Sequence, residues 1–226
     1  MGWDVRDALA HLAGTDVEAT RAMLQPEEFQ AGLGDLSADI EGFLRSQLTD
    51  RYGLTREQLL AESQESFDAL LAALAGLAGD ARIPWYGPPM SPASFATARL
   101  MEYWAHGQDV ADAFGVQRRA TDRLRHIAHL GFRTLGFSFQ VRGLAVPDAA
   151  VQVALTAPDG STWAYGDPAA PEAVSGSALD FCLLVTQRRH RDDTDLVAKG
   201  PTADAWLDVA QCFAGLPSVG RARAAS

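Results

Sequence analysis

The sequence predicts an α+β protein, with an up-down helical bundle over residues 1–145 and a small α/β domain over residues 146–226. Up to about residue 141, apolar residues recur at helical spacing, and short connections that contain proline or glycine separate the segments. After Pro147, alternating and β-branched runs such as "VQVALTA" and "STWAYG" replace this period. The change of period indicates two domains of different class.

Each helix of the bundle is predicted from its apolar face and from the signals at its ends. The threonine and glutamine of "TREQ", residues 55–58, have the spacing of a capping box, and "SP" at 91–92 places a capping serine before a first-turn proline. Pro26 and "GLGDLS" at 32–37 are expected to interrupt the helical pattern. The predicted helices cover residues 3–24, 36–48, 55–79, 92–115 and 121–141.

In the second domain, "PDG" at 158–160 is predicted to join two strands as a hairpin turn. The segment "GSALDFCLLVTQRR" is predicted as a helix, "TDLVAKG" as a short strand, and "PTADAWLDVAQCFAG" as a helix with Pro201 near its start. Cys182 and Cys212 lie in apolar runs, so we expect buried thiols and no disulfide framework.

The charge balance limits the partners that we expect. Lysine and arginine total 19 against 29 aspartate and glutamate residues, which gives a formal net charge of −10. Such a protein has no electrostatic reason to bind nucleic acid or an anionic membrane. The N-terminal segment lacks the pattern of a secretory signal, and no run of about 18 apolar residues occurs. We therefore expect a cytoplasmic protein that acts on a small-molecule substrate.

The stretch "ARLMEYWAHGQDVADAFG", residues 98–115, places polar residues where a helix usually packs. Glu102, His106 and Asp109 are spaced i, i+4 and i+7, so all three fall on one helical face. A carboxylate and an imidazole from successive turns supply two ligands of the kind that first-row divalent ions prefer. The alternative for such a pair is a solvated helix face.

A third ligand must come from another helix, and the first helix offers His11 within an apolar stripe. Two histidines and one glutamate would leave a coordination position open, as a catalytic metal requires. Asp7 or Asp109 would then accept an imidazole N–H or act as an acid or base. The alternative is a histidine that is simply packed in the core. His126 and His129 have no acidic partner in a motif and are expected along a helix side.

The segment "GWDVRDALAHL", followed later by "RLMEYWAHGQDVADAFG", resembles the DinB-like superfamily, most of all its mycothiol-dependent maleylpyruvate isomerase branch. Members of this branch have a helical bundle that binds a divalent metal, usually zinc, and a C-terminal α/β domain. The resemblance implies that His11, Glu102 and His106 are the metal ligands and that Asp109 is the functionally important acid. The segment "GSALDFCLLVTQRR" is similar to the C-terminal pattern and places Arg188 at the arginine position.

The resemblance also implies mycothiol as a thiol cofactor, which a divalent metal would hold as the nucleophilic thiolate. In an isomerase, the thiolate adds to the cis double bond of an unsaturated carboxylate-type substrate, and rotation followed by expulsion of the thiol gives the trans product. In a thiol transferase, the thiol stays attached. Arg188 would pair with a substrate carboxylate, and the alternative for Arg188 is a structural salt bridge near "RRHRDDTD".

The sequence departs from the family in one respect, because the family usually has a further helix before its GW motif. The alternatives are a truncated start of the chain and a partner subunit that supplies the missing packing, since an uncovered apolar face would favour a homodimer. The subgroup that shares "AHGQDVADAFG" and "RRHRDDTDLVAKG" often has no assigned reaction, so isomerase activity is implied at family level only. The alternatives are a metal-scaffold enzyme of secondary metabolism that catalyses cyclisation or hydrolysis, and a non-catalytic protein that binds a metal or a small molecule.

Overall fold

A computed structural model describes residues 3–36, 42, 46, 48–218 and 220–224 of the chain. The chain divides into two compact units, Met1–Val110 and Ala111–Ser226. The first unit is helical, and the second contains a four-stranded sheet with helices packed against it. The predicted α+β class is therefore confirmed.

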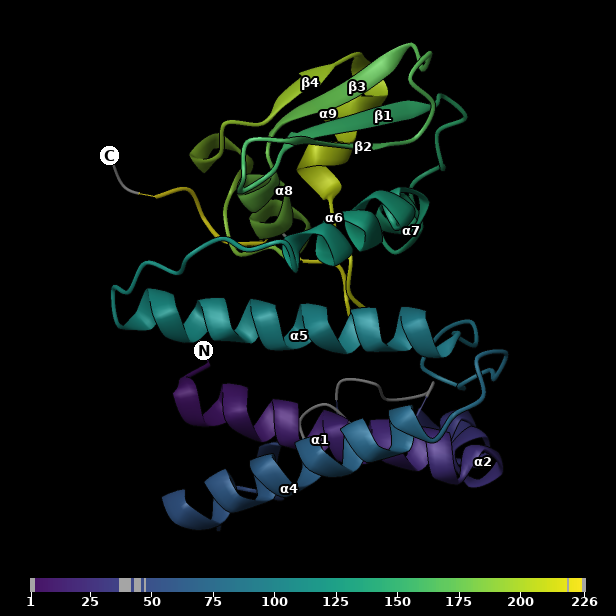
Figure 1. Cartoon of the computed structure of the whole chain (residues 1–226), viewed down its shortest axis with the longest axis vertical. Helices are drawn as coiled ribbons and strands as arrows, with labels where there is room; N and C mark the ends of the chain where they lie inside the picture. The colour runs from purple at the N-terminus through teal and green to yellow at the C-terminus, as the bar shows by residue number, and fades with distance from the viewer. Residues whose placement is uncertain (1–2, 37–41, 43–45, 47, 219, 225–226) are drawn as a thin grey trace. The chain divides into compact units, whose positions relative to one another are not determined.

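The first unit contains α1 (Val5–Leu24), α2 (Pro26–Leu36), α4 (Arg56–Ala75) and most of α5 (Pro92–Ala113). Figure 1 shows α1 lying beside α4, and α2 also packs on α1. The helices predicted near residues 3–24, 55–79 and 92–115 are confirmed, with ends that shift by a few residues.

Side chains at the predicted positions start two of these helices. The backbone N–H of Gln58 donates to Thr55 Oγ1 over 3.2 Å, and the N–H of Thr55 donates to Gln58 Oε1 over 2.7 Å. Ser91 Oγ accepts from the N–H of Ser94 over 3.2 Å, and Pro92 is the first residue of α5. Both signals satisfy N–H groups that have no partner within the helix itself.

The predicted interruption at Pro26 is confirmed, because α1 ends at Leu24 and Pro26 is the first residue of α2, where proline loses no intrahelical hydrogen bond. The interruption predicted at "GLGDLS" is wrong for residues 32–36, because α2 continues through them to Leu36. The helix predicted over residues 36–48 falls mostly outside the described residues.

The apolar core of the first unit gathers residues from α1, α2, α4 and α5 and from the loop that joins α4 to α5. Its buried members are Ala19, Ala22, Met23, Phe29, Leu70, Ala73, Ile83 and Phe95. Trp85 packs against this cluster, with its ring stacked on Phe29 at 5.6 Å between centroids. The core thus joins the C-terminal half of α1 to the N-terminal half of α5.

The sheet of the second unit has the strand order β2-β1-β3-β4, as Figure 1 shows. Its strands are β1 (Val151–Thr156), β2 (Thr162–Tyr165), β3 (Glu172–Ser177) and β4 (Val197–Lys199). β1 pairs with β2 antiparallel and with β3 parallel, and β3 pairs with β4 antiparallel. The predicted hairpin is confirmed, and Gly160 in its turn has φ 84°. β3 was not predicted.

The helices of the second unit are α6 (Leu124–Arg133), α7 (Leu135–Gln140), α8 (Ala178–Val185) and α9 (Pro201–Val209), with a 3-10 turn η1 (Arg191–Asp193). The single helix predicted over 121–141 is wrong, because the helix breaks at Thr134. α6 packs on α8 and β2, and α7 packs on α9. At Gly131 an added Cβ would lie 2.9 Å from Val185, so the missing side chain lets α6 approach α8 closely.

These contacts place residues 124–140 in the second compact unit. The division between the units lies at Val110–Ala111, whereas the sequence pattern suggested residues 145 and 146. The predicted buried thiols are confirmed, because Cys182 and Cys212 are both buried and neither is in a disulfide. Among the described helices, none combines the length and apolarity needed to cross a bilayer.

Candidate metal centre

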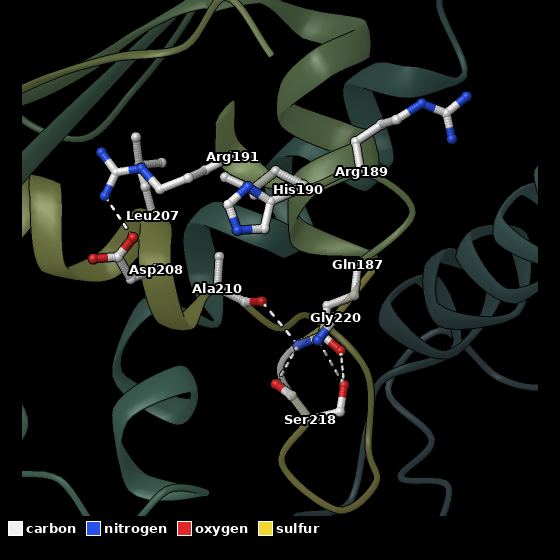
Figure 2. A pocket seen from close by; sticks show the side chains of 10 residues that line it. Gln187, Arg189, His190, Arg191, Leu207, Asp208, Ala210, Ser218 and Gly220 are labelled. Atoms are coloured by element: carbon white, nitrogen blue, oxygen red, sulfur yellow. Dashed lines mark hydrogen bonds and ion pairs between the residues drawn. The ribbon is translucent and has the colours of Figure 1, made fainter. Parts of the chain in front are cut away.

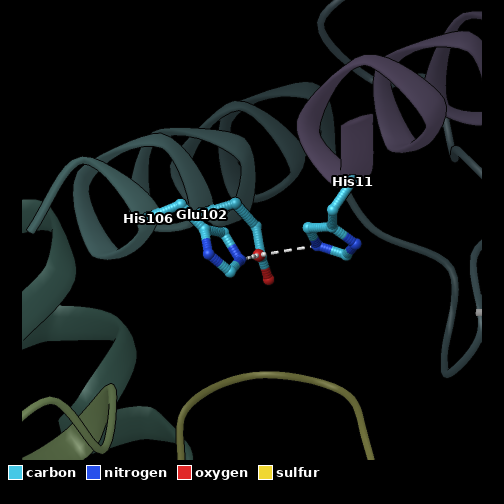
Figure 3. Close-up of side chains that lie close together, drawn as sticks. All are labelled: His11, Glu102 and His106. Atoms are coloured by element: carbon cyan, nitrogen blue, oxygen red, sulfur yellow. Dashed lines mark ion pairs between the residues drawn. The ribbon is translucent and has the colours of Figure 1, made fainter. Parts of the chain in front are cut away.

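Three side chains from two distant segments converge in the first unit (Figure 3). His11 comes from α1, while Glu102 and His106 come from successive turns of α5. One ligand atom from each residue lies within 4.8 Å of the others. His11 Nε2 lies 3.5 Å from Glu102 Oε2, and His106 Nε2 lies 3.4 Å from the same oxygen.

The geometry of this cluster suits a tetrahedral divalent cation. Zinc–nitrogen and zinc–oxygen bonds of about 2.0–2.1 Å at tetrahedral angles put neighbouring ligand atoms about 3.3 Å apart. The two nitrogen–oxygen distances of 3.5 and 3.4 Å are close to this value. Two imidazoles and one carboxylate also leave a fourth position for a further ligand. The donor set and its spacing therefore fit zinc or a similar ion.

Of the two acids predicted to support an imidazole, only Asp109 contacts one. Asp109 Oδ2 lies 3.1 Å from His106 Nδ1, so the carboxylate can accept the Nδ1–H and leave the Nε2 lone pair for a metal. Asp7 instead forms a capping box with Asp4 at the start of α1, accepting the N–H of Asp4 over 3.0 Å.

Burial and ion pairs set the charges of the cluster. Burial alone would raise the pKa of Glu102, but hydrogen bonds and charge from His106 and His11 outweigh it and hold this pKa well below its ordinary value. Burial lowers the pKa of His11, against the opposing effect of Glu102. At neutral pH, Glu102 is therefore anionic and His11 neutral, which are the protonation states that metal ligands need.

Trp3 is part of the cluster, although its role was not predicted. Its ring stacks on His106, with centroids 5.4 Å apart and planes at 17°, and lies 5.0 Å from the His11 ring. The Trp3 residue is 50% exposed, while the side chains of His11 and His106 are only 12% and 9% exposed. The indole therefore covers one side of the two imidazoles. The GW motif at the start of the chain is the signal from which this role could have been predicted.

Arg188, the other predicted site residue, lies in the second unit just after α8. The N–H of Arg188 donates to the Leu183 carbonyl over 2.7 Å, and the N–H of Gln187 donates to Leu184 over 2.8 Å. These two bonds form a Schellman turn, in which Gln187 takes φ 60°, a left-handed conformation that is rare for residues other than glycine. The Arg188 guanidinium donates to the Thr186 carbonyl over 2.5 Å.

The arginines that follow Arg188 hold structural ion pairs. Arg189 pairs with Asp112 over 2.6 Å, and Arg191 pairs with Asp204 and Asp208 over 2.7 and 2.6 Å. The carboxylates that neutralise Arg189 and Arg191 thus come from other parts of the same unit, whereas the sequence suggested the adjacent "DDTD".

A pocket of about 50 Å³ lies beside this basic run in the second unit. Figure 2 shows Gln187, His190 and Ser218 along it, with the Arg189 guanidinium pointing away from these residues. Both arginines at its edge, Arg189 and Arg191, are paired with carboxylates. This pairing argues against an anion site in the pocket.

Known proteins share both the sequence and the fold of this chain. The family model described as "Mycothiol maleylpyruvate isomerase N-terminal domain" matches residues 1–111. The uncharacterized protein Rv0036c of Mycobacterium tuberculosis strain H37Rv is 43% identical over 220 residues, covering 97% of this chain and 86% of the relative. The uncharacterized protein MT0041 of strain CDC 1551 matches to the same extent.

The crystal structure of a mycothiol-dependent maleylpyruvate isomerase has a similar fold. Its TM-score is 0.54 at 15% sequence identity, and the match covers 89% of this chain and 81% of that one. At this identity the likeness concerns the fold, whereas the family model and the 43% identical relatives concern the sequence itself. Residues 1–111 therefore belong to the family of the mycothiol maleylpyruvate isomerase N-terminal domain, and the chain as a whole belongs to one family with Rv0036c.

Proposed function

We propose that this chain is a divalent-metal-dependent enzyme that acts with mycothiol on an unsaturated carboxylate-type substrate, by isomerisation or by thiol transfer. The observation that carries the proposal is the convergence of His11, Glu102 and His106, whose ligand atoms lie within 4.8 Å of one another. Membership of the mycothiol maleylpyruvate isomerase family supports the choice of thiol and of reaction class.

Zinc is the metal that this donor set favours, because imidazole and carboxylate ligands in a four-coordinate site are typical of zinc. A bound divalent cation would keep a coordinated thiol deprotonated at neutral pH. His11, Glu102 and His106 would hold the ion from two helices, and the Asp109 carboxylate would orient His106 through its Nδ1–H.

Arg188 is proposed to bind a substrate carboxylate, because a guanidinium can donate two parallel hydrogen bonds to a carboxylate. The net charge of −10 agrees with a small-molecule substrate and argues against a nucleic-acid partner. We also propose a cytoplasmic location, on the sequence grounds given above.

The test begins with the metal content of the purified protein and of two variants. Wild type is expected to hold close to one equivalent of zinc, and His11→Ala is expected to lose it. His126→Ala is the matched control, because His126 is an exposed histidine on α6 outside the cluster. If wild type and His11→Ala take up zinc equally, the metal centre is refuted.

Turnover then separates the remaining functions. Maleylpyruvate is supplied to the zinc-loaded protein with and without mycothiol, and isomerisation or thiol adduct formation is followed by chromatography. Activity that needs both zinc and mycothiol supports the proposal. Zinc binding without any turnover would instead support a non-catalytic binder or an enzyme with different chemistry, and turnover without a thiol would refute the role of mycothiol.

A further inference from the structure

A buried charged network joins α1 to α5 one helical turn away from the metal cluster. Arg99 donates to Asp16 Oδ1 from Nε over 3.1 Å and from Nη2 over 2.7 Å, and Nη2 also donates to Thr15 Oγ1 over 2.9 Å. The Tyr103 hydroxyl donates to the other oxygen of Asp16. Both oxygens of the carboxylate are thus used, one by each of two residues on α5.

This network is unusually deep for charged side chains. Asp16 is 0% exposed and Arg99 is 6% exposed. A buried ion pair is poor evidence for stability, because removing two charges from water costs about as much as their attraction returns, and apolar residues of similar size often do as well. Stability alone therefore does not explain why Asp16 and Arg99 are buried together. Fixing the relative position of two helices is a known use of buried polar groups.

The location of the network suggests what it positions. Along the two antiparallel helices, an apolar layer with Ala19 and Phe95 comes first, the ion pair between Asp16 and Arg99 follows, and His11 with Glu102 comes next. Each layer takes one residue from α1 and one from α5. A shift of either helix along its axis at the ion pair would therefore also move His11 relative to Glu102.

The ion-pair layer is linked to the layer of His11 and Glu102 in two ways: by hydrogen bonds on α1 and by the covalent backbone on α5. The Thr15 hydroxyl accepts from Arg99 and donates to the backbone carbonyl of His11 over 2.8 Å. On α5, Tyr103 directly follows Glu102, and Arg99 lies three positions before Glu102. The network is thus connected to the backbone of His11 on α1, and its two α5 residues lie before and after Glu102 in the sequence.

We infer that Arg99, Asp16 and Tyr103 form a positioning network that fixes α1 against α5 and so sets the distance of His11 from Glu102 and His106. This inference rests on the proposed function, because it gives the network the task of preorganising the metal ligands. Preorganisation of this kind raises metal affinity, and loss of an outer-shell partner typically costs 10–100-fold in affinity. The three residues touch neither metal nor substrate in this role.

The test replaces the whole network by apolar residues of similar size, in the variant Asp16→Leu/Arg99→Met/Tyr103→Phe of the full chain. Circular dichroism and cooperative thermal unfolding report whether the variant is folded. Two further measurements report on the ligands: the nuclear Overhauser effect between the His11 and His106 ring protons in metal-free protein, and the affinity and visible spectrum of Co²⁺. The ring centroids are 4.9 Å apart, close enough for the effect to be observed.

The folded triple variant is expected to lose the contact between the rings, to bind Co²⁺ about 10–100-fold more weakly and to show shifted Co²⁺ bands. Arg51→Met/Glu62→Leu is the matched control, because both residues of this 2.7 Å ion pair belong to the same unit but lie outside α1 and α5 in the sequence. The control should keep the ring contact and the wild-type affinity. A folded triple variant that keeps both would overturn the inference.

Two results need separate treatment. If the triple variant does not fold, Tyr103→Phe decides by the same measurements, because it removes one donor to Asp16 and keeps the ring; unchanged ring contact and affinity would overturn the inference. If wild type itself binds no Co²⁺, the proposed function fails, but the ring contact in metal-free wild type and variant still decides whether the network positions His11.

Discussion

The hydrogen bond between Asp109 and His106 gives the sharpest prediction for the metal centre. Asp109→Asn keeps the shape of the side chain but replaces a carboxylate acceptor by a neutral amide. The bond to be changed spans 3.1 Å between Asp109 Oδ2 and His106 Nδ1. Hydrogen bonds to charged groups contribute about 1.5–3 kcal/mol and neutral ones about 0.5–1.5 kcal/mol. The difference is thus about 1–1.5 kcal/mol.

Each 1.4 kcal/mol is about a factor of ten in affinity, so Asp109→Asn should weaken zinc binding about tenfold. The Asp109 side chain is 27% exposed, which places the effect at the low end of the 10–100-fold range for outer-shell partners. Competition with a chromophoric chelator measures the affinity. Asp112→Asn is the matched control, since this carboxylate lies three residues further along α5 and pairs with Arg189. Equal losses in both variants would show an effect of net charge and refute the role given to Asp109.

Three further predictions concern other parts of the chain. Co²⁺ binding should quench Trp3 emission, because the indole lies 5.0 Å and 5.4 Å from the two imidazole rings, and the quenched fraction should vanish in Trp3→Phe. Gly200→Ala should lower the free energy of unfolding in urea by at least about 2 kcal/mol, because φ is 102° and the new Cβ would lie 2.6 Å from the Glu172 carboxylate that accepts the N–H of Ala203. Burial raises the pKa of the Cys182 thiol well above its ordinary value, so this thiol stays protonated at pH 8 and should react with a disulfide reagent only after unfolding.

The convergence of His11, Glu102 and His106 could be predicted because its signals are local. The i, i+4 spacing of Glu102 and His106 fixes their common face on any helix, and His11 sits in a short motif of its own. Capping signals such as Thr55 with Gln58 are equally local, and the structure confirms them. Features that depend only on residues within one or two helical turns could therefore be predicted from the sequence.

Features that depend on long-range packing were missed. Asp16 and Arg99 are 83 residues apart, and nothing near either one distinguishes a buried ion pair from two surface charges. The break at Thr134 and the packing of α6 on α8 depend on Gly131 facing Val185, which local periodicity does not show. The helix that begins at Pro26 was missed, because this proline predicts the end of α1 but is equally compatible with the first residue of a new helix.

The left-handed residue after α8 has a consequence for how this family can vary. Glycine would accept the angle at Gln187 without strain, yet the glutamine side chain also donates to the Ala210 carbonyl over 3.3 Å and accepts from the Ser218 hydroxyl over 2.5 Å. Exchange for glycine would relieve the backbone but remove both side-chain hydrogen bonds, whereas a β-branched residue would be strained at this angle. A substitution at position 187 therefore affects both the turn that leads into Arg188 and Arg189 and the hydrogen bonds to Ala210 and Ser218.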